Sequence, residues 1–199
     1  MTESIREEIR KICQNPALTE ANNLYELWFM IHTLYGTVDV RDLIEFLTEQ
    51  DLTPQEIVSD WADEQLPPFM FYGCNVFGNG KIILPKHIKM IDQGCFKYST
   101  LHSIECPEVT EIEKWAFAYS DLKSIITPSV QFIGYKAFSH SPLKYFTVPE
   151  TIVEINQYAF DYCPELMLYL PKQNIGPDDE EYEEFLDWVS KQVKEVNFY

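Results

Sequence analysis

Apolar and polar residues alternate in short runs along the middle of the chain, and each run ends at a proline. These prolines are spaced 22, 21, 21 and 22 residues apart, at Pro85, Pro107, Pro128, Pro149 and Pro171. The core-type side chains stand one and three places before each proline, as Ile82 and Leu84 do in the first run. A period of two is typical of a strand with one buried face, and a proline ends a strand where its missing N–H costs least. The pattern therefore predicts a series of short, half-buried strands.

Four more columns of similar residues recur between the prolines. An isoleucine is followed five places later by a phenylalanine, three further places on by a small polar residue, and then by a leucine. The columns are Ile91, Ile112, Ile133 and Ile155; Phe96, Phe117, Phe138 and Phe160; Ser99, Ser120, Ser141 and Cys163; and Leu101, Leu122, Leu143 and Leu166. A unit of this length cannot bury its own apolar side, so the units are expected to stack into a solenoid around one shared core.

One such unit, LKSIITPSVQFIGYKAFSHSP from Leu122 to Pro142, resembles the BspA-like, or Treponema-type, leucine-rich repeat. That repeat reads roughly LxxIxIPxxVxxIGxxAFxxC, and the resemblance covers about residues 79–171. It implies an α+β protein: a short leucine-rich-repeat solenoid of about four to five coils, with parallel strands on its concave face. It also implies a binding scaffold and names no ligand.

The flanking segments read as helical. Residues 1–68 are expected to form an acidic domain of four short helices that begin at Ser4, Thr19, Asp39 and Thr53, each a preferred N-cap type. Thr53-Pro54-Gln55-Glu56 combines an N-cap, a proline at the first helical position and a glutamate at the third. Residues 69–177 are assigned to the repeats, and the aromatic and Gly-rich segment 69–80 to the joint with the helical domain. Residues 178–199 are expected to form an acidic C-terminal capping helix, with Tyr182, Phe185, Leu186, Val189 and Val193 on one face.

Charge narrows the range of partners. The formal net charge is −17, from 32 acidic and 15 basic residues. Residues 1–66 carry 14 acidic and 4 basic side chains, whereas residues 67–177 carry 10 and 9. Direct nucleic-acid binding needs clustered Lys and Arg, so we expect none. No apolar run approaches ~20 residues, so we expect no membrane span. The N-terminal segment lacks an apolar signal core, which predicts a cytoplasmic protein with free thiols.

The sequence carries no recognisable catalytic or metal-binding pattern. The four histidines His32, His87, His102 and His140 have no metal-ligand spacing, and neither GxSxG nor a P-loop is present. Three of the five cysteines (Cys95, Cys106 and Cys163) occupy repeat columns, where core packing is their expected role. We therefore expect no enzyme activity, no cofactor and no metal.

Two columns are candidate binding surfaces. Alternation places one set of strand residues on the outward, concave face, and the candidate partner-binding residues are Ile83, Glu105, Ile126, Tyr145, Thr147, Met167 and Tyr169. Aromatic residues and Met are enriched in protein interfaces. Two alternatives stay open: these residue types also suit strands in general, and the C-terminal helix could cover them. The second column, two places after each Phe, is Tyr98, Tyr119, His140 and Tyr162. These side chains are expected either to pack between successive coils or to contact a partner.

These observations predict a non-catalytic scaffold that binds another protein through the concave repeat face, the acidic helical surface, or both. An alternative is a small acidic inhibitor, such as a phage-encoded protein that counters a defence system. It would occupy a basic nucleic-acid-binding groove of its target by charge mimicry.

Overall fold

The structure is a computed structural model that describes residues 39–49, 51–75, 77, 81–172 and 179–199, with Arg6, Glu7, Arg10, Lys11 and Thr33. The chain divides into two compact units, Met1–Asp63 and Glu64–Tyr199. Apart from Arg6, Glu7, Arg10, Lys11 and Thr33, which are helical, the predicted helices that begin at Ser4 and Thr19 lie outside the described residues. Within the described ranges, no helix is both long enough and apolar enough to cross a lipid bilayer.

The first unit contains helices α3 (Val40–Glu49) and α4 (Pro54–Asp60), and both begin where the sequence predicts. The Asp39 carboxylate accepts a hydrogen bond from the backbone N–H of Arg41 at 2.9 Å. The Thr53 hydroxyl accepts from the Glu56 N–H at 3.2 Å, and the Glu56 carboxylate accepts from the Thr53 N–H at 2.8 Å. This reciprocal capping box satisfies two donors that the first turn of a helix otherwise leaves unpaired.

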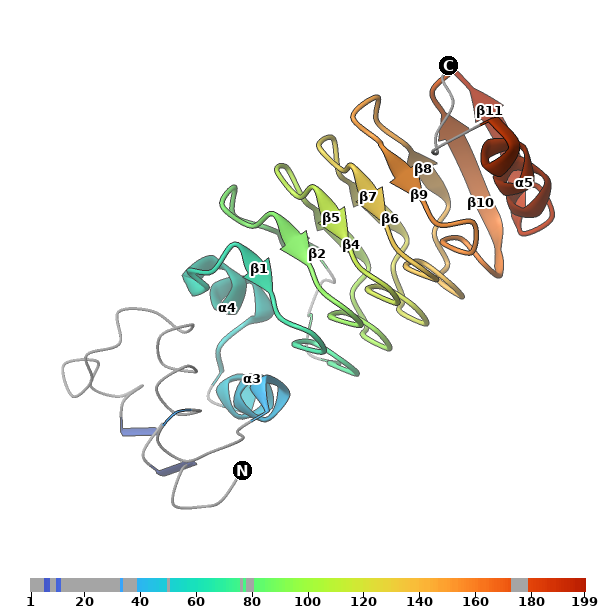
Figure 1. Cartoon of the computed structure of the whole chain (residues 1–199). Coiled ribbons are helices and arrows are strands. Elements are labelled where there is room, and N and C mark those ends of the chain that lie inside the picture. The colour runs from blue at the N-terminus through green and yellow to red at the C-terminus, as the bar shows by residue number, and fades with distance from the viewer. Residues whose placement is uncertain are drawn as a thin grey trace. The chain divides into compact units, whose positions relative to one another are not determined.

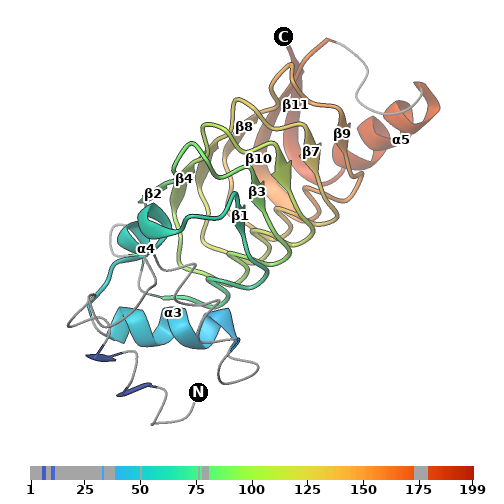
Figure 2. The same ribbon diagram turned by 60° about the vertical axis from the view of Figure 1, so that its left-hand side comes forward.

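The second unit is a solenoid whose coils each contribute one strand to each of two parallel sheets, and a C-terminal strand extends one of these sheets (Figure 1). The five-stranded sheet consists, in order, of β1 (Gln65–Leu66), β3 (Met90–Ile91), β5 (Glu111–Ile112), β7 (Phe132–Ile133) and β9 (Glu154–Ile155). The six-stranded sheet consists, in order, of β2 (Lys81–Ile83), β4 (Ser103–Glu105), β6 (Ser124–Ile126), β8 (Tyr145–Thr147), β10 (Cys163–Leu170) and β11 (Val193–Phe198). Helix α5 (Asp179–Val189) lies between β10 and β11 in the chain. Figure 2 shows the strands of the two sheets on different sides of the coil stack.

The phenylalanine column forms the centre of the solenoid core. Phe96, Phe117, Phe138 and Phe160 are all buried, and consecutive rings stack with centroids 5.3 to 5.4 Å apart and planes within 5° of parallel. The isoleucine and leucine columns are buried beside them. This arrangement confirms that the coils share one interior, as the spacing of the columns predicts.

The repeats begin one coil earlier than the sequence analysis placed them. Leu66, assigned there to the helical domain, lies in β1 and pairs with Ile91 of β3. Phe71, assigned to a joint, stacks on Phe96 with centroids 5.2 Å apart. The signal was present in the sequence, because Leu66 and Phe71 keep the five-residue spacing of the isoleucine and phenylalanine columns. The first coil therefore starts near residue 64, and not at residue 69.

The C-terminal segment is a helix followed by a strand, which corrects the prediction of a helix over residues 178–199. Helix α5 ends at Val189, and Val193 belongs to β11, which pairs in parallel with β10. Tyr182, Phe185 and Val189 are buried, as the predicted apolar face requires. The correction has a tertiary cause: β11 supplies hydrogen-bond partners to the edge of β10, which helix α5 alone would leave unpaired.

Candidate interaction surfaces

The outward face of the six-stranded sheet carries the side chains that alternation predicts. In the inward set Ile82, Ile104 and Phe146 are buried, and Ile125 is half-buried. Of the seven candidate partner-binding residues, Ile83, Ile126, Tyr145 and Thr147 are exposed, whereas Glu105, Met167 and Tyr169 are half-buried. The facing of the strands is therefore as predicted, and the degree of exposure differs from coil to coil.

The first coils of this sheet face are polar and satisfy their own charges. Lys81 and Glu105 form an ion pair at 2.9 Å, and the Ser124 hydroxyl donates to that of Ser103 at 2.9 Å. The Glu105 carboxylate is thus already held within the sheet face. Glu105, one of the seven candidate partner-binding residues, therefore neutralises Lys81 beside the exposed Ile83.

The later coils of the same face are apolar. Ile126 is 58% exposed and Tyr145 is 60% exposed. Tyr145 is level with Met167 of the next strand, and Thr147 with Tyr169. We call Ile126, Tyr145, Met167 and Tyr169 the sheet patch. Strand β11 continues the face beyond it, since Glu195 is level with Met167 and Asn197 with Tyr169, and it adds polar residues that the sequence analysis did not include.

A second surface follows the turn after each phenylalanine. Tyr98, Tyr119, His140 and Tyr162 have φ values of 55° to 61°, the left-handed region, so the same unusual backbone turn recurs in four coils. Their rings stack along the solenoid, with centroid distances of 5.1, 4.3 and 4.5 Å between consecutive members. We call this row the tyrosine ladder. It makes the contacts between coils that the sequence analysis considered, and all four residues are nevertheless exposed.

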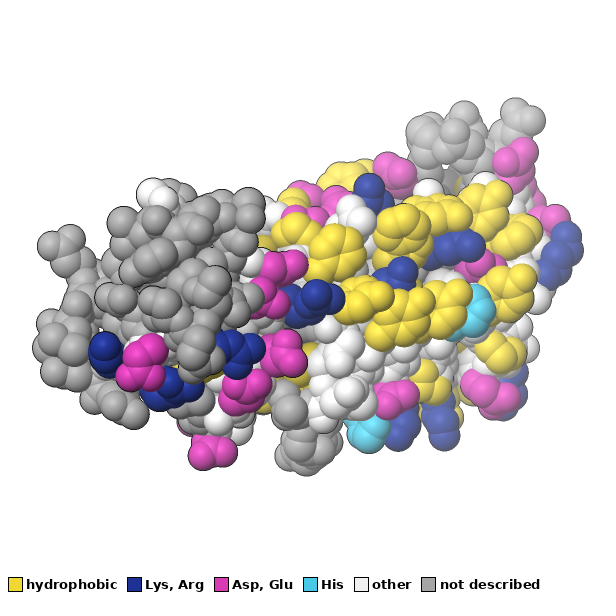
Figure 3. All heavy atoms as spheres, turned by 90° about the horizontal axis from the view of Figure 1, so that it is seen from below, with side chains coloured by type: hydrophobic (Ala, Val, Ile, Leu, Met, Phe, Trp, Pro, Cys, Tyr) yellow, Lys and Arg dark blue, Asp and Glu magenta, His cyan; other side chains and the backbone are white. Residues whose placement is uncertain are grey.

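A second aromatic row was missed from the sequence. Trp115, Tyr135, Tyr158 and Trp188 pack edge to face, with centroids 4.9 to 6.0 Å apart. The Lys97 ammonium lies 5.0 Å from the centre of the Trp115 ring and 5.2 Å from that of Tyr98. Figure 3 shows this face, where hydrophobic side chains gather in rows with lysines between them. The signal is weak in the sequence because Trp188 comes from α5, outside the repeat.

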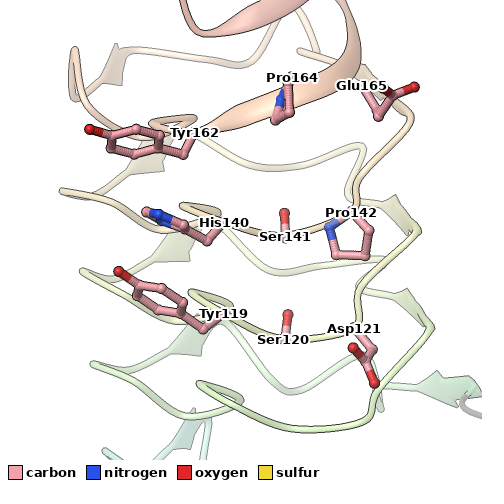
Figure 4. A pocket seen from close by; sticks show the side chains of 9 residues that line it. All are labelled: Tyr119, Ser120, Asp121, His140, Ser141, Pro142, Tyr162, Pro164 and Glu165. Carbon is pink, nitrogen blue, oxygen red and sulfur yellow. The ribbon is translucent and has the colours of Figure 1, made fainter.

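An open groove of about 460 Å³ runs beside the tyrosine ladder (Figure 4). The ladder residues Tyr119, His140 and Tyr162 form one side. The other side is formed by a row of exposed residues two places after the ladder, Asp121, Pro142 and Pro164, together with Glu165. Ser120 and Ser141 lie on the floor between the two sides. The repeat pattern in the sequence indicated one side of this groove only.

The buried thiols are suited to packing and not to chemistry. Burial raises the pKa of the Cys163 thiol to about 11, and burial also raises the pKa of Cys95 and Cys106. All three thiols therefore stay protonated at neutral pH, which removes the thiolate that a nucleophile or a metal ligand needs. Among the described residues, no group of three or more His, Cys, Asp or Glu side chains is arranged to hold a metal ion.

One pair has the distance of a catalytic contact. The Ser139 hydroxyl lies 2.8 Å from Nδ1 of His140. Ser139 is only 1% exposed, so a substrate has no access to its hydroxyl. The contact instead orients the His140 ring within the tyrosine ladder.

Comparison with known proteins gives one result for the repeats. A family model described as the BspA type leucine rich repeat region, with 6 copies, matches residues 59–167. The comparisons with curated proteins and with solved structures found no match. The matched range includes β1 and the first coil, in agreement with the structure.

Proposed function

The chain belongs to the BspA-type leucine-rich-repeat family, and from this premise we propose that it is a scaffold that binds a partner protein through the sheet patch. Leucine-rich repeats are in general protein-interaction scaffolds, and solenoids of this family are typically non-catalytic. The observation that supports the finer proposal is the exposed apolar cluster around Tyr145, which lies beside polar coils in which Ile83 is the exposed apolar residue of the candidate set.

The sheet patch has the composition and rigidity of a binding site. Tyr side chains bury large areas at low entropy cost and are frequent hot spots of protein interfaces. The parallel pairing of β8 with β10 fixes Met167 beside Tyr145, and Ser124 of β6 pairs with Tyr145 on the other side. Because the patch is already ordered before binding, little conformational entropy is lost when a partner docks. The polar rim comes from Glu105 on one side and Glu195 on the other.

The partner is expected to present a complementary apolar surface. A stable interface buries about 800 Å² on each side, which is larger than four side chains supply. The proposal therefore places the energetic centre of the interface at Tyr145 and Ile126, with surrounding sheet residues as the rim.

The test uses two exposed tyrosines on different surfaces. Tyr145 on the sheet is 60% exposed, and Tyr135, which belongs neither to the sheet patch nor to the groove beside the tyrosine ladder, is 38% exposed. Proteins captured from the native host by the wild-type chain are identified by mass spectrometry, purified, and titrated against each variant by calorimetry. Tyr145→Ala is expected to weaken binding of the partner by about 2 kcal/mol, or roughly 30-fold, as for a hot-spot residue. Tyr135→Ala is expected to leave it within about threefold. Equal effects of the two variants would remove the sheet patch from the interface.

Salt dependence separates the sheet patch from the acidic surface of residues 1–66. Contacts between exposed charges are screened over a Debye length of about 8 Å at physiological salt, whereas apolar burial is insensitive to moderate salt. Raising NaCl from 50 to 300 mM is expected to change the affinity by less than about threefold. A steep loss of affinity together with competition by DNA or RNA would instead favour the charge-mimic inhibitor.

A further inference from the structure

The groove beside the tyrosine ladder has a chemistry that restricts its ligand. Its two sides differ: aromatic rings stand on one side, and the pyrrolidine rings of Pro142 and Pro164 on the other (Figure 4). Asp121 and Glu165 accompany the prolines and are exposed, and none of the described residues forms an ion pair with either carboxylate. The groove is therefore apolar on both sides and negatively charged on one.

The ring faces of the ladder are not available for stacking. Tyr119 lies between Tyr98 and His140, with ring planes inclined by 21° and 16° to its neighbours. His140 in turn has Tyr162 on its other side, with centroids 4.5 Å apart. Sugars and nucleobases bind aromatic residues through open ring faces. The ladder offers only ring edges over most of its length, so the groove does not fit these ligands.

The groove also lacks the backbone donors that a β-strand ligand needs. In the turns of two neighbouring coils, five backbone N–H groups at the groove already donate to backbone carbonyls, at N···O distances of 2.8 to 3.3 Å. They belong to Tyr119, Ser120, Asp121, His140 and Ser141. The Ser120 hydroxyl donates to the carbonyl of Phe117 at 2.7 Å, and prolines have no N–H. An added strand would find no row of donors here.

A polyproline II helix does not need such donors, because its backbone is fully solvated and it docks through its side chains in grooves lined by aromatic residues. Its dimensions also match the solenoid. One turn of polyproline II spans 3 residues and about 9.3 Å, and two coils at the strand spacing of roughly 4.8 Å span about 9.6 Å. Every third residue of such a ligand therefore meets every second coil. Tyr119 and Tyr162 are separated by two coils, and so are Asp121 and Glu165.

We propose that this groove binds a proline-rich segment of a partner protein in the polyproline II conformation, with Arg or Lys at every third position facing Asp121 and Glu165. The site is separate from the sheet patch and does not depend on it. The prolines of the ligand occupy the space between the tyrosine ladder and the Pro142–Pro164 side. Its basic side chains pair with the two carboxylates, which the described residues leave without an ion pair.

The experiment measures fluorescence anisotropy of two labelled peptides of equal charge, acetyl-(Arg-Pro-Pro)₄-amide and acetyl-(Arg-Gly-Ser)₄-amide. Both place Arg at every third residue, but only the first is held in polyproline II, because Gly and Ser make a flexible chain. The groove variant is Asp121→Asn with Glu165→Gln. The control variant removes the same charge elsewhere on the second unit, by Glu154→Gln with Glu183→Gln, both exposed. Circular dichroism checks that each surface variant stays folded.

The wild-type chain is expected to bind the Pro-containing peptide at least tenfold more tightly than the Gly-Ser peptide. The groove variant is expected to lose at least tenfold of that affinity, whereas the control variant and Tyr145→Ala change it less than threefold. The proposal is overturned if the two peptides bind with equal affinity, or if the groove and control variants lose equal affinity. Either result would show that the basic peptide is attracted to the acidic chain as a whole. Undetectable binding at millimolar peptide would overturn it as well. Because Tyr145 is outside the groove, these outcomes are independent of the proposal for the sheet patch.

Discussion

Replacing Phe117 by Ala tests the physical basis of the whole solenoid. The Phe117 side chain is fully buried, and its ring is stacked between those of Phe96 at 5.3 Å and Phe138 at 5.4 Å. Truncating a buried Phe to Ala costs about 3–5 kcal/mol, through lost burial and the cavity left behind. The two aromatic contacts that Phe117 loses, worth about 0.5–1.5 kcal/mol each, are already part of this cost and place it toward the upper end of the range. The coils above and below are tied by parallel strands and cannot collapse into the cavity, so we expect a loss of about 4–5 kcal/mol.

The assay is urea unfolding followed by far-UV circular dichroism. With a slope of about 2 kcal/mol per M urea, the midpoint of Phe117→Ala is expected to fall by roughly 2 M. The matched control is Phe132→Ala, because Phe132 lies in β7 but is 39% exposed, and its loss is expected to stay below about 1 kcal/mol. Phe117→Leu keeps most of the volume and should fall between the two. If Phe117→Ala cost no more than Phe132→Ala, the stacked column would not be what holds adjacent coils together.

Three further predictions concern a helix cap, an ion pair and a buried thiol. Thr53→Ala removes the capping box of α4 and should cost about 1 kcal/mol of helix stability, measured by amide exchange in α4. Hydrogen bonds from the Thr53 N–H and hydroxyl lower the pKa of Glu56, so an NMR titration of the variant should show this pKa closer to its ordinary value. Lys136→Met leaves the carboxylate of Asp161, which is 5% exposed, without the cation that lies 3.1 Å away. Breaking a fully buried ion pair costs about 3–5 kcal/mol, and because the Lys136 side chain is 30% exposed, thermal unfolding should show a loss of at most about 3 kcal/mol. Adding Asp161→Asn should recover most of this loss. Burial raises the pKa of Cys163 to about 11, so the folded state keeps this proton when the unfolded state has lost it. The contribution of this thiol to stability is therefore complete below its pKa in the unfolded chain, about 8.5, and is lost at up to ~1.4 kcal/mol per pH unit as the pH rises toward its pKa in the folded protein. Cys163→Ser introduces the residue found at this position in three other coils. Thermal melts between pH 8 and 11 should then show a smaller loss of stability with rising pH for this variant than for the wild-type chain.

Short-range spacing was sufficient to predict the solenoid and its interior. The five-residue interval between Ile112 and Phe117 recurs in each unit, and both columns are buried in the structure. Alternation also predicted which strand residues point inward, because successive side chains of a strand lie on opposite faces. These properties follow from local geometry, so they can be read from the order of residues alone. The capping box at Thr53 was predicted for the same reason.

The surfaces depended on contacts between residues far apart in the chain. Strand β11 forms because β10 has an open edge. The local sequence around Val193 contains no information about that edge. The groove beside the tyrosine ladder forms because coils about 21 residues apart in sequence place Asp121 and Pro142 in one row. The sequence by itself thus determined the repeat, the strand faces and the core. Only the tertiary structure decided which outward side chains stay exposed and which gather into a surface, because exposure depends on what packs alongside, and local periodicity carries no information about that neighbour.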